Sequence, residues 1–231
     1  MIELIGTWLI SYDSGFDVLR YLTVRTIGGT LTALMVSILL GPTLIRFLSR
    51  IQFSQSIRGD GPESHLLKSG TPTMGGLIII FSVIISTLLW SDFNNPYIWI
   101  LIFITMTFGI IGFFDDWLKI REKNSKGLSA KYKLIFQSIF AFMAMIFMLQ
   151  VSPEGDQQIF IMPFNKELIF TISPIIFLCM SIFIIVGSSN AVNLTDGLDG
   201  LAILPSVLIA GGLGLIAYAS GNILIADYLF I

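Results

Sequence analysis

Long apolar runs separated by short polar segments dominate the chain. A hydrocarbon core of about 30 Å needs roughly 20 apolar residues in a helix, so runs near this length predict membrane spans. The predicted spans are 22–45, 74–91, 97–114, 133–151, 168–187 and 201–219. These runs are continuous rather than alternating, which favours helices over the strands of a β-barrel. The pattern predicts an all-α polytopic membrane protein with a single domain over residues 1–231.

The composition supports this fold class and excludes several others. Hydrophobic residues make up 55% of the chain and charged residues 12%. Soluble domains carry about 25% charged residues, so neither a cytosolic globule nor a disordered chain is expected. The single cysteine excludes a disulfide framework, and the single histidine, His65, excludes a multi-histidine metal site. We interpret His65 as a solvated loop residue rather than a proton shuttle.

Basic residues are concentrated in the connections after the first and third predicted spans. Together with Lys133 at the very start of the fourth span, these two connections hold ten of the thirteen lysines and arginines, whereas residues 92–96 hold none and 152–167 hold one. Cytoplasmic loops of membrane proteins carry an excess of Lys and Arg. We therefore expect the connections after spans one, three and five to face the cytoplasm, and the N-terminus to face outward.

The first of these connections, residues 59–76, reads GDGPESHLLKSGTPTMGG. Its Lys68, Thr71 and Thr73 lie beside a Gly/Pro-rich turn that enters the second span. Backbone N–H groups, hydroxyls and a lysine suit a phosphate ligand. The alternative is a solvated turn in which Thr71 or Thr73 caps the helix.

The second connection begins with paired aspartates, Asp115 and Asp116, at the end of the apolar stretch FGIIGFF. Lys119 follows at helical spacing from both carboxylates. Adjacent carboxylates at a bilayer edge repel each other and are costly to desolvate. A divalent cation would remove both problems, and hard oxygen ligands suit Mg²⁺ with a phosphate substrate. The alternative is a charged helix end that snorkels into water.

The third connection, residues 187–202, reads GSSNAVNLTDGLDGLA. Amide and carboxylate side chains recur there every third residue, which places them along one face of a helix or helical turn. The four residues are Asn190, Asn193, Asp196 and Asp199. They suit a sugar, a base edge, a metal or a lysine, and the alternative is an Asx-rich turn.

Taken together, three stretches resemble one family. GPESHLLKSGTPTMGG, DDWLK and NAVNLTDGLDGLA are similar to phospho-N-acetylmuramoyl-pentapeptide transferase, within the polyprenyl-phosphate N-acetylhexosamine-1-phosphate transferase superfamily. The resemblance extends over essentially the whole chain. It implies a bacterial inner-membrane enzyme that transfers phospho-MurNAc-pentapeptide from UDP-MurNAc-pentapeptide to undecaprenyl phosphate, with UMP and lipid I as products. It also implies Mg²⁺ dependence and an active site on the cytoplasmic face.

The resemblance further implies roles for individual residues. Asp115 and Asp116 match the paired aspartates, which bind the metal and supply either a base or, in a competing scheme, a nucleophile. Lys119 accompanies them as a catalytic residue. The implied substrate-binding residues are Lys68, Thr73, Lys131, Lys133, Asn190, Asn193, Asp196 and Asp199. The lipid bilayer is a partner, a homodimer is a candidate assembly, and no nucleic-acid partner is expected.

The family has ten spans and this sequence predicts six, so we expect the C-terminal part of the family fold, with a further metal-binding aspartate, to be missing. One alternative is a related GlcNAc-1-phosphate transferase, and another is an inactive remnant. A transporter is disfavoured, because transporters place ionisable residues near span midplanes. Here the acidic residues gather at predicted span ends.

Overall fold

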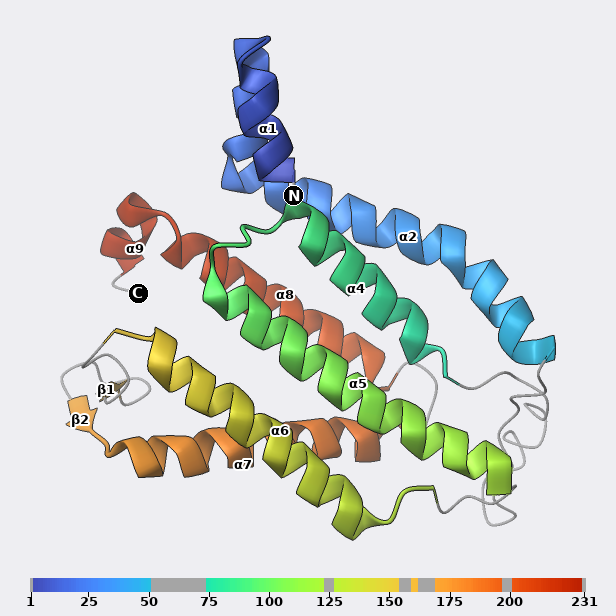
Figure 1. Ribbon diagram of the computed structural model, residues 1–231. Coiled ribbons are helices and arrows are strands. Elements are labelled where there is room, and N and C mark those ends of the chain that lie inside the picture. Colours follow the sequence, from blue (N-terminus) through green and yellow to red (C-terminus); the bar gives the residue numbers. More distant parts are fainter. Residues whose placement is uncertain are drawn as a thin grey trace. The chain divides into compact units, whose positions relative to one another are not determined.

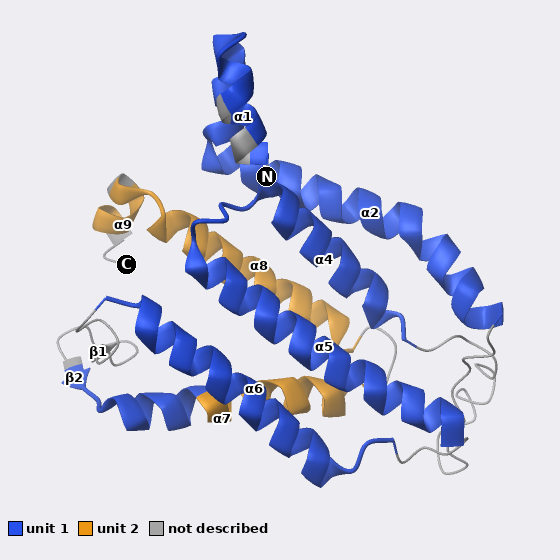
Figure 2. Ribbon diagram, in the orientation of Figure 1, with its two compact units in different colours: residues 1–181 blue, residues 182–231 orange. Residues whose placement is uncertain are grey.

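The computed structural model describes residues 2–50, 74–122, 127–153, 159–161, 169–196 and 201–229. The chain divides into two compact units, residues 1–181 and 182–231 (Figure 2). Helices make up most of both units (Figure 1), which confirms the predicted all-α class. The elements are α1 (Ile2–Ile10), η1 (Ser14–Arg20), α2 (Leu22–Arg50), α4 (Gly76–Trp90), α5 (Pro96–Glu122), α6 (Ala130–Val151), β1 (Ile159–Ile161), β2 (Ile169–Thr171), α7 (Pro174–Thr195), α8 (Ile203–Ser220) and α9 (Ile223–Leu229).

Among the described helices, α2, α5, α6, α7 and α8 are long and apolar enough to cross a membrane. Each of them overlaps a predicted span. Helix α4, on the predicted span 74–91, has 15 residues. Its axis is therefore about 22 Å long, which is shorter than a hydrocarbon core of about 30 Å. The six-span count stays a prediction, as does the outward orientation of the N-terminus.

The predicted start of the fifth span, residue 168, is wrong. Residues 169–171 form β2, which pairs antiparallel with β1 in the register Ile159↔Thr171 and Ile161↔Ile169. The helix begins at Pro174, because proline suits the first turn of a helix, where its missing N–H has no partner to lose. Apolar β-branched residues fit a strand as well as a membrane span, so hydropathy alone placed this boundary too early.

The N-terminal residues also form helices that the hydropathy pattern did not predict. The Asp13 carboxylate caps η1 by accepting a hydrogen bond from the Gly15 N–H at 2.7 Å. The ring of Trp8 in the preceding α1 lies edge to face with the ring of Tyr12, just after this helix, with their centroids 4.9 Å apart. These short helices lead directly into α2 at Leu22.

Within the first unit, α2 packs on α4, α4 lies beside α5, and α5 packs on α6 (Figure 1). The α2–α4 contact is made by polar groups as well as by close packing. Arg25 Nε donates to the Trp90 carbonyl at 2.8 Å, and Trp90 Nε1 donates to Thr32 Oγ1 at 2.9 Å. A Cβ atom on Gly28 would overlap the Trp90 ring, so glycine is required for this approach.

The α5–α6 contact buries small and apolar side chains. Ala141, Ala144 and Met145 of α6 are buried, as is Ile111 of α5. Small residues let helix backbones approach closely, which is the usual basis of helix packing in membranes. This interface matters for function because it continues along α5 to Asp115, one helical turn beyond Ile111.

Large apolar side chains are exposed on both units. Leu101 of α5 is 66% exposed, and Phe183 of α7 is 79% exposed. Helix α8 buries none of its residues, although its 18 residues are strongly apolar. Water contact would cost about 25 cal/mol for each Å² of such surface, whereas lipid chains remove this cost. The exposed surface is that of a multi-pass membrane protein.

Candidate active site

The candidate active site is built on the last turns of α5. This helix has 27 residues, so its axis is about 40 Å long and continues past the predicted span 97–114. The continuation carries Asp115, Asp116 and Lys119 on consecutive turns. Asp115 is 8% exposed and lies on the buried face of α5 with Ile111, whereas the Asp116 side chain is 33% exposed.

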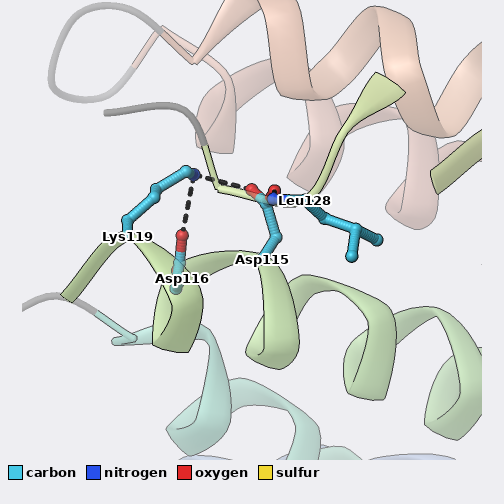
Figure 3. Close-up of polar contacts among 4 residues, drawn as sticks. All are labelled: Asp115, Asp116, Lys119 and Leu128. Carbon is cyan, nitrogen blue, oxygen red and sulfur yellow. Dashed lines mark hydrogen bonds and ion pairs between the residues drawn. The ribbon is translucent and has the colours of Figure 1, made fainter. Parts of the chain in front are cut away.

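Lys119 bridges the two carboxylates (Figure 3). Its Nζ lies 2.6 Å from Asp115 Oδ2 and 3.1 Å from Asp116 Oδ1. Lys119 is four residues after Asp115 and three after Asp116, so one helical turn brings the ammonium group over both. The three side chains carry a net charge of −1, and the ammonium group offsets the repulsion between the adjacent carboxylates.

A backbone amide from the connection between α5 and α6 forms a second contact with the Asp115 carboxylate. The Leu128 N–H donates to Asp115 Oδ1 at 2.8 Å (Figure 3). Both carboxylate oxygens of Asp115 are therefore engaged, one by Lys119 and the other by Leu128. Asp116 Oδ2 takes no part in these contacts. Asp115 is held in one orientation, and Asp116 offers an oxygen to a ligand.

Aromatic and basic side chains flank this centre. The Arg121 guanidinium lies 5.3 Å from the Trp117 ring centroid, and Phe114 meets Trp117 edge to face at 6.4 Å. Tryptophan favours the boundary between membrane and water, because its ring is apolar and its N–H is polar. Arginine beside it can extend its charged head toward water. This end of α5 has the composition of a membrane boundary.

The donor set at this centre fits Mg²⁺. Among the described residues there is no group of three or more His, Cys, Asp or Glu side chains that could hold a metal ion. Two hard carboxylates are nevertheless sufficient, because Mg²⁺ is commonly held by one or two carboxylates together with substrate phosphates and water. Asp116 Oδ2 and the partly exposed position of Asp116 suit that kind of site.

The structure also locates some of the other predicted site residues. Lys131 and Lys133 lie in the first turn of α6, and the Leu128–Asp115 hydrogen bond brings the residues just before this helix against the aspartate pair. In the second unit, Asn190 and Asn193 lie in the last turns of α7, and Asp196 follows directly. Asn190 Nδ2 donates to the Val186 carbonyl at 2.8 Å.

The helical spacing predicted for the third connection is confirmed for Asn190, Asn193 and the start of the following turn, where the Asp196 N–H donates to the Val192 carbonyl at 3.1 Å. Asp199 lies outside the described residues. So do the predicted first-connection residues Lys68, Thr71 and Thr73, and His65.

Two backbone conformations were not predicted from the sequence, and the first of them lies at the site. Gly127 adopts a φ of +58° and presents the Leu128 amide to Asp115; its signal was a glycine in a polar connection just before a helix. Met74 has a φ of +70°, which is uncommon for a residue with a side chain.

The fold and site define a multi-pass α-helical membrane protein with a lysine-bridged aspartate pair at one end of a span. The chain belongs to glycosyl transferase family 4, whose family model matches residues 98–231. Residues 68–80 match signature 1 of phospho-N-acetylmuramoyl-pentapeptide transferase. These matches confirm the predicted membership among the polyprenyl-phosphate hexosamine-1-phosphate transferases. The protein is thus a membrane sugar-phosphate transferase that acts on a polyprenyl phosphate.

Proposed function

We propose that the protein transfers phospho-MurNAc-pentapeptide from UDP-MurNAc-pentapeptide to undecaprenyl phosphate, giving lipid I and UMP. The match of residues 68–80 to a signature of this particular transferase carries the proposal. The lysine-bridged aspartate pair supports it, because transfer between two phosphate compounds requires charge neutralisation at a fixed position. The location of the pair at one end of a span suits a lipid substrate that meets a water-soluble one.

The proposed reaction is a displacement at phosphorus. An oxygen of undecaprenyl phosphate attacks the phosphorus that carries the sugar. The bond from this phosphorus to the bridging oxygen breaks, and the bridging oxygen leaves with UMP. One aspartate of the pair accepts the proton of the lipid phosphate, so the attacking oxygen is fully ionised. Lys119, shared between both carboxylates, keeps them from repelling the incoming phosphates.

The proposed cofactor is Mg²⁺, held by Asp115 and Asp116. When bound, the ion would neutralise charge on the phosphate oxygens and could lower the barrier by several kcal/mol. Lys131 and Lys133, in the first turn of α6, add positive charge where a diphosphate would lie.

The remaining proposed roles follow the family motifs. Lys68 and Thr73 bind phosphate, and Asn190, Asn193, Asp196 and Asp199 bind the nucleotide sugar. We further propose that the site faces the cytoplasm of a bacterium and that the protein lies in its cytoplasmic membrane. The basic connections around Arg46 to Lys68 and Lys119 to Lys133 support this orientation.

Release of UMP from purified protein in detergent micelles tests the proposal. With undecaprenyl phosphate and Mg²⁺ present, we expect release from UDP-MurNAc-pentapeptide and none from UDP-GlcNAc. Chelation of Mg²⁺ should stop the reaction. Asp115→Asn and Asp116→Asn should each lower the rate by about 10²-fold or more, the usual effect of losing an electrostatic catalytic group.

Two outcomes would contradict this proposal. Release from UDP-GlcNAc alone would assign the protein to the related GlcNAc-1-phosphate transferases. No release from either nucleotide sugar would favour an inactive remnant over an enzyme.

A further inference from the structure

Gly127 lies directly against the aspartate pair. Its φ of +58° falls in the left-handed region, which side chains with a Cβ atom seldom adopt. A Cβ atom built at this position would lie 2.6 Å from Asp115 Oδ1, 2.8 Å from Lys119 Cε and 3.0 Å from the Asp115 carbonyl oxygen. The space for a side chain is already filled by two residues of the candidate active site.

We propose that Gly127 is a positioning residue of the transferase, and that it acts by aiming the Leu128 N–H at Asp115. The left-handed turn at Gly127 directs this N–H toward Asp115 Oδ1, at 2.8 Å. The absence of a side chain lets the backbone approach close enough for the bond to form. This inference rests on the proposed function, because it assigns the effect of Gly127 to the same aspartate pair.

The Leu128 hydrogen bond gives the two carboxylates different roles. Asp115 is bound on both oxygens, so it has one orientation and holds Lys119 over Asp116. A side chain at position 127 would displace the Asp115 carboxylate, and Lys119 would move with it. The catalytic groups would then be displaced from the reacting atoms by on the order of 1 Å, which can lower a catalytic rate by about 10²-fold.

Gly127→Ala and Gly127→Asn, made in the full chain, test the proposal. Asparagine tolerates the left-handed conformation better than alanine does, yet it carries the same Cβ atom. We expect both variants to lower kcat by about 10²-fold with little change in KM for the nucleotide sugar. The matched control is Gly112→Ala on α5, where a Cβ atom would meet nothing within 4 Å. Its kcat should equal that of the parent protein.

Recovery of kcat by asparagine would overturn the proposal, because it would leave backbone strain as the whole effect. A rise in KM with kcat unchanged would overturn it too, since a displaced catalytic group must slow the chemical step.

Amide hydrogen exchange at Leu128 separates this inference from the proposed function. We expect exchange at Leu128 to be about tenfold faster in Gly127→Ala than in the parent, as for the loss of one hydrogen bond to a charged group. Gly112→Ala should leave the exchange rate unchanged. If the parent releases no UMP, the proposed function fails, and the exchange rates still decide the positioning. Equal amide exchange rates at Leu128 in the parent and in Gly127→Ala would overturn the inference, even if the enzyme is fully active.

Discussion

Lys119 is the cation that allows two adjacent carboxylates to lie at the end of an apolar helix. The side chains of Asp115 and Lys119 are 11% and 22% exposed, so their charges are only partly solvated. Loss of one partner from such a pair leaves the other charge without compensation, which costs more than the pair contributes. Lys119 is therefore expected to act in both stability and catalysis.

Replacement of Lys119 by methionine keeps the length of the side chain and removes its charge. We expect Lys119→Met to lower the free energy of unfolding by about 1–3 kcal/mol, because Asp115 loses a charged hydrogen-bond partner. Thermal unfolding in detergent, followed by tryptophan fluorescence, would measure the change. Arg121→Gln is the control, since Arg121 contacts the Trp117 ring rather than the carboxylates. Equal unfolding midpoints for Lys119→Met and the parent would refute the expectation.

The two aspartates should differ in stability although both are needed for activity. Asp115 accepts from Leu128 and Lys119, whereas Asp116 is bound by Lys119 alone in these contacts. In Asp115→Asn, the new amide group would face either the Lys119 ammonium or the Leu128 N–H, both of which are donors. Asp115→Asn should therefore lower the unfolding midpoint more than Asp116→Asn does. The reverse order, in the same thermal assay, would argue against the fixed role of Asp115.

Helix α4 is short for a membrane span, and its attachment to α2 depends on groups near its C-terminal end. Arg25 binds the carbonyl of Trp90, and a basic group at this end of a helix is favoured by the helix dipole. Ser86 Oγ donates to the Gly29 carbonyl at 2.5 Å, one turn before Trp90. The pair of helices is thus joined by polar contacts that lipid cannot replace.

The two adjacent glycines of α2 allow a sharp test of this contact. Gly28→Ala would place a Cβ atom against the Trp90 ring, and overpacking of this kind costs about 1–3 kcal/mol. Gly29→Ala would place its Cβ atom 3.5 Å from Ser86 Oγ, an ordinary contact. We expect Gly28→Ala to lower the unfolding midpoint and Gly29→Ala to leave it close to that of the parent. Identical midpoints would mean that α2 and α4 do not approach closely at Trp90.

For the chain as a whole, the proposed function assigns roles to residues of both compact units. Asp115, Asp116 and Lys119 belong to the first unit, and Asn193 and Asp196 belong to the second. The proposed function requires that these groups share one substrate. Proximity between the two sets is therefore the prediction on which the complete site depends.

Cross-linking would test that proximity. With Cys179 replaced by serine, the pair Asp116→Cys and Asp196→Cys should be joined rapidly by a short bifunctional maleimide. Asp116→Cys with Asn95→Cys is the control, because these positions are separated by about 30 Å along α5. Cross-linking of the control pair alone would contradict a shared site.

The orientation of the protein in the membrane can be tested with single cysteines in the same background. Asn94 and Ser129 are both exposed; Asn94 lies just before α5, and Ser129 lies just before α6, in the connection that contacts Asp115. In sealed right-side-out vesicles, a membrane-impermeant maleimide should label Asn94→Cys at once. Ser129→Cys should react after the membrane is opened. Immediate labelling of Ser129→Cys would reverse the predicted orientation and place the aspartate pair outside the cytoplasm.

Hydropathy and local motifs were enough to place most helices and to recognise the family. A membrane helix satisfies its backbone hydrogen bonds within itself and buries its side chains in lipid, so a continuous apolar run is a sufficient local signal. The i,i+3 and i,i+4 spacing of Asp115, Asp116 and Lys119 likewise predicted their proximity. The hairpin of β1 and β2 was not predicted, because β2 belongs to an apolar run that resembles a span and β1 is only three residues long.

The Leu128 amide on Asp115, the left-handed Gly127 and the Trp90 ring over Gly28 became visible only once the helices were packed together. The Leu128 and Trp90 contacts join groups that lie far apart along the chain, so they leave no periodic signal. The geometry of these contacts depends on how closely two backbones approach. The volumes of the side chains at the contact determine that distance. Local composition thus specified the helices and the chemistry of the acidic motif, and packing between helices specified how that motif is held.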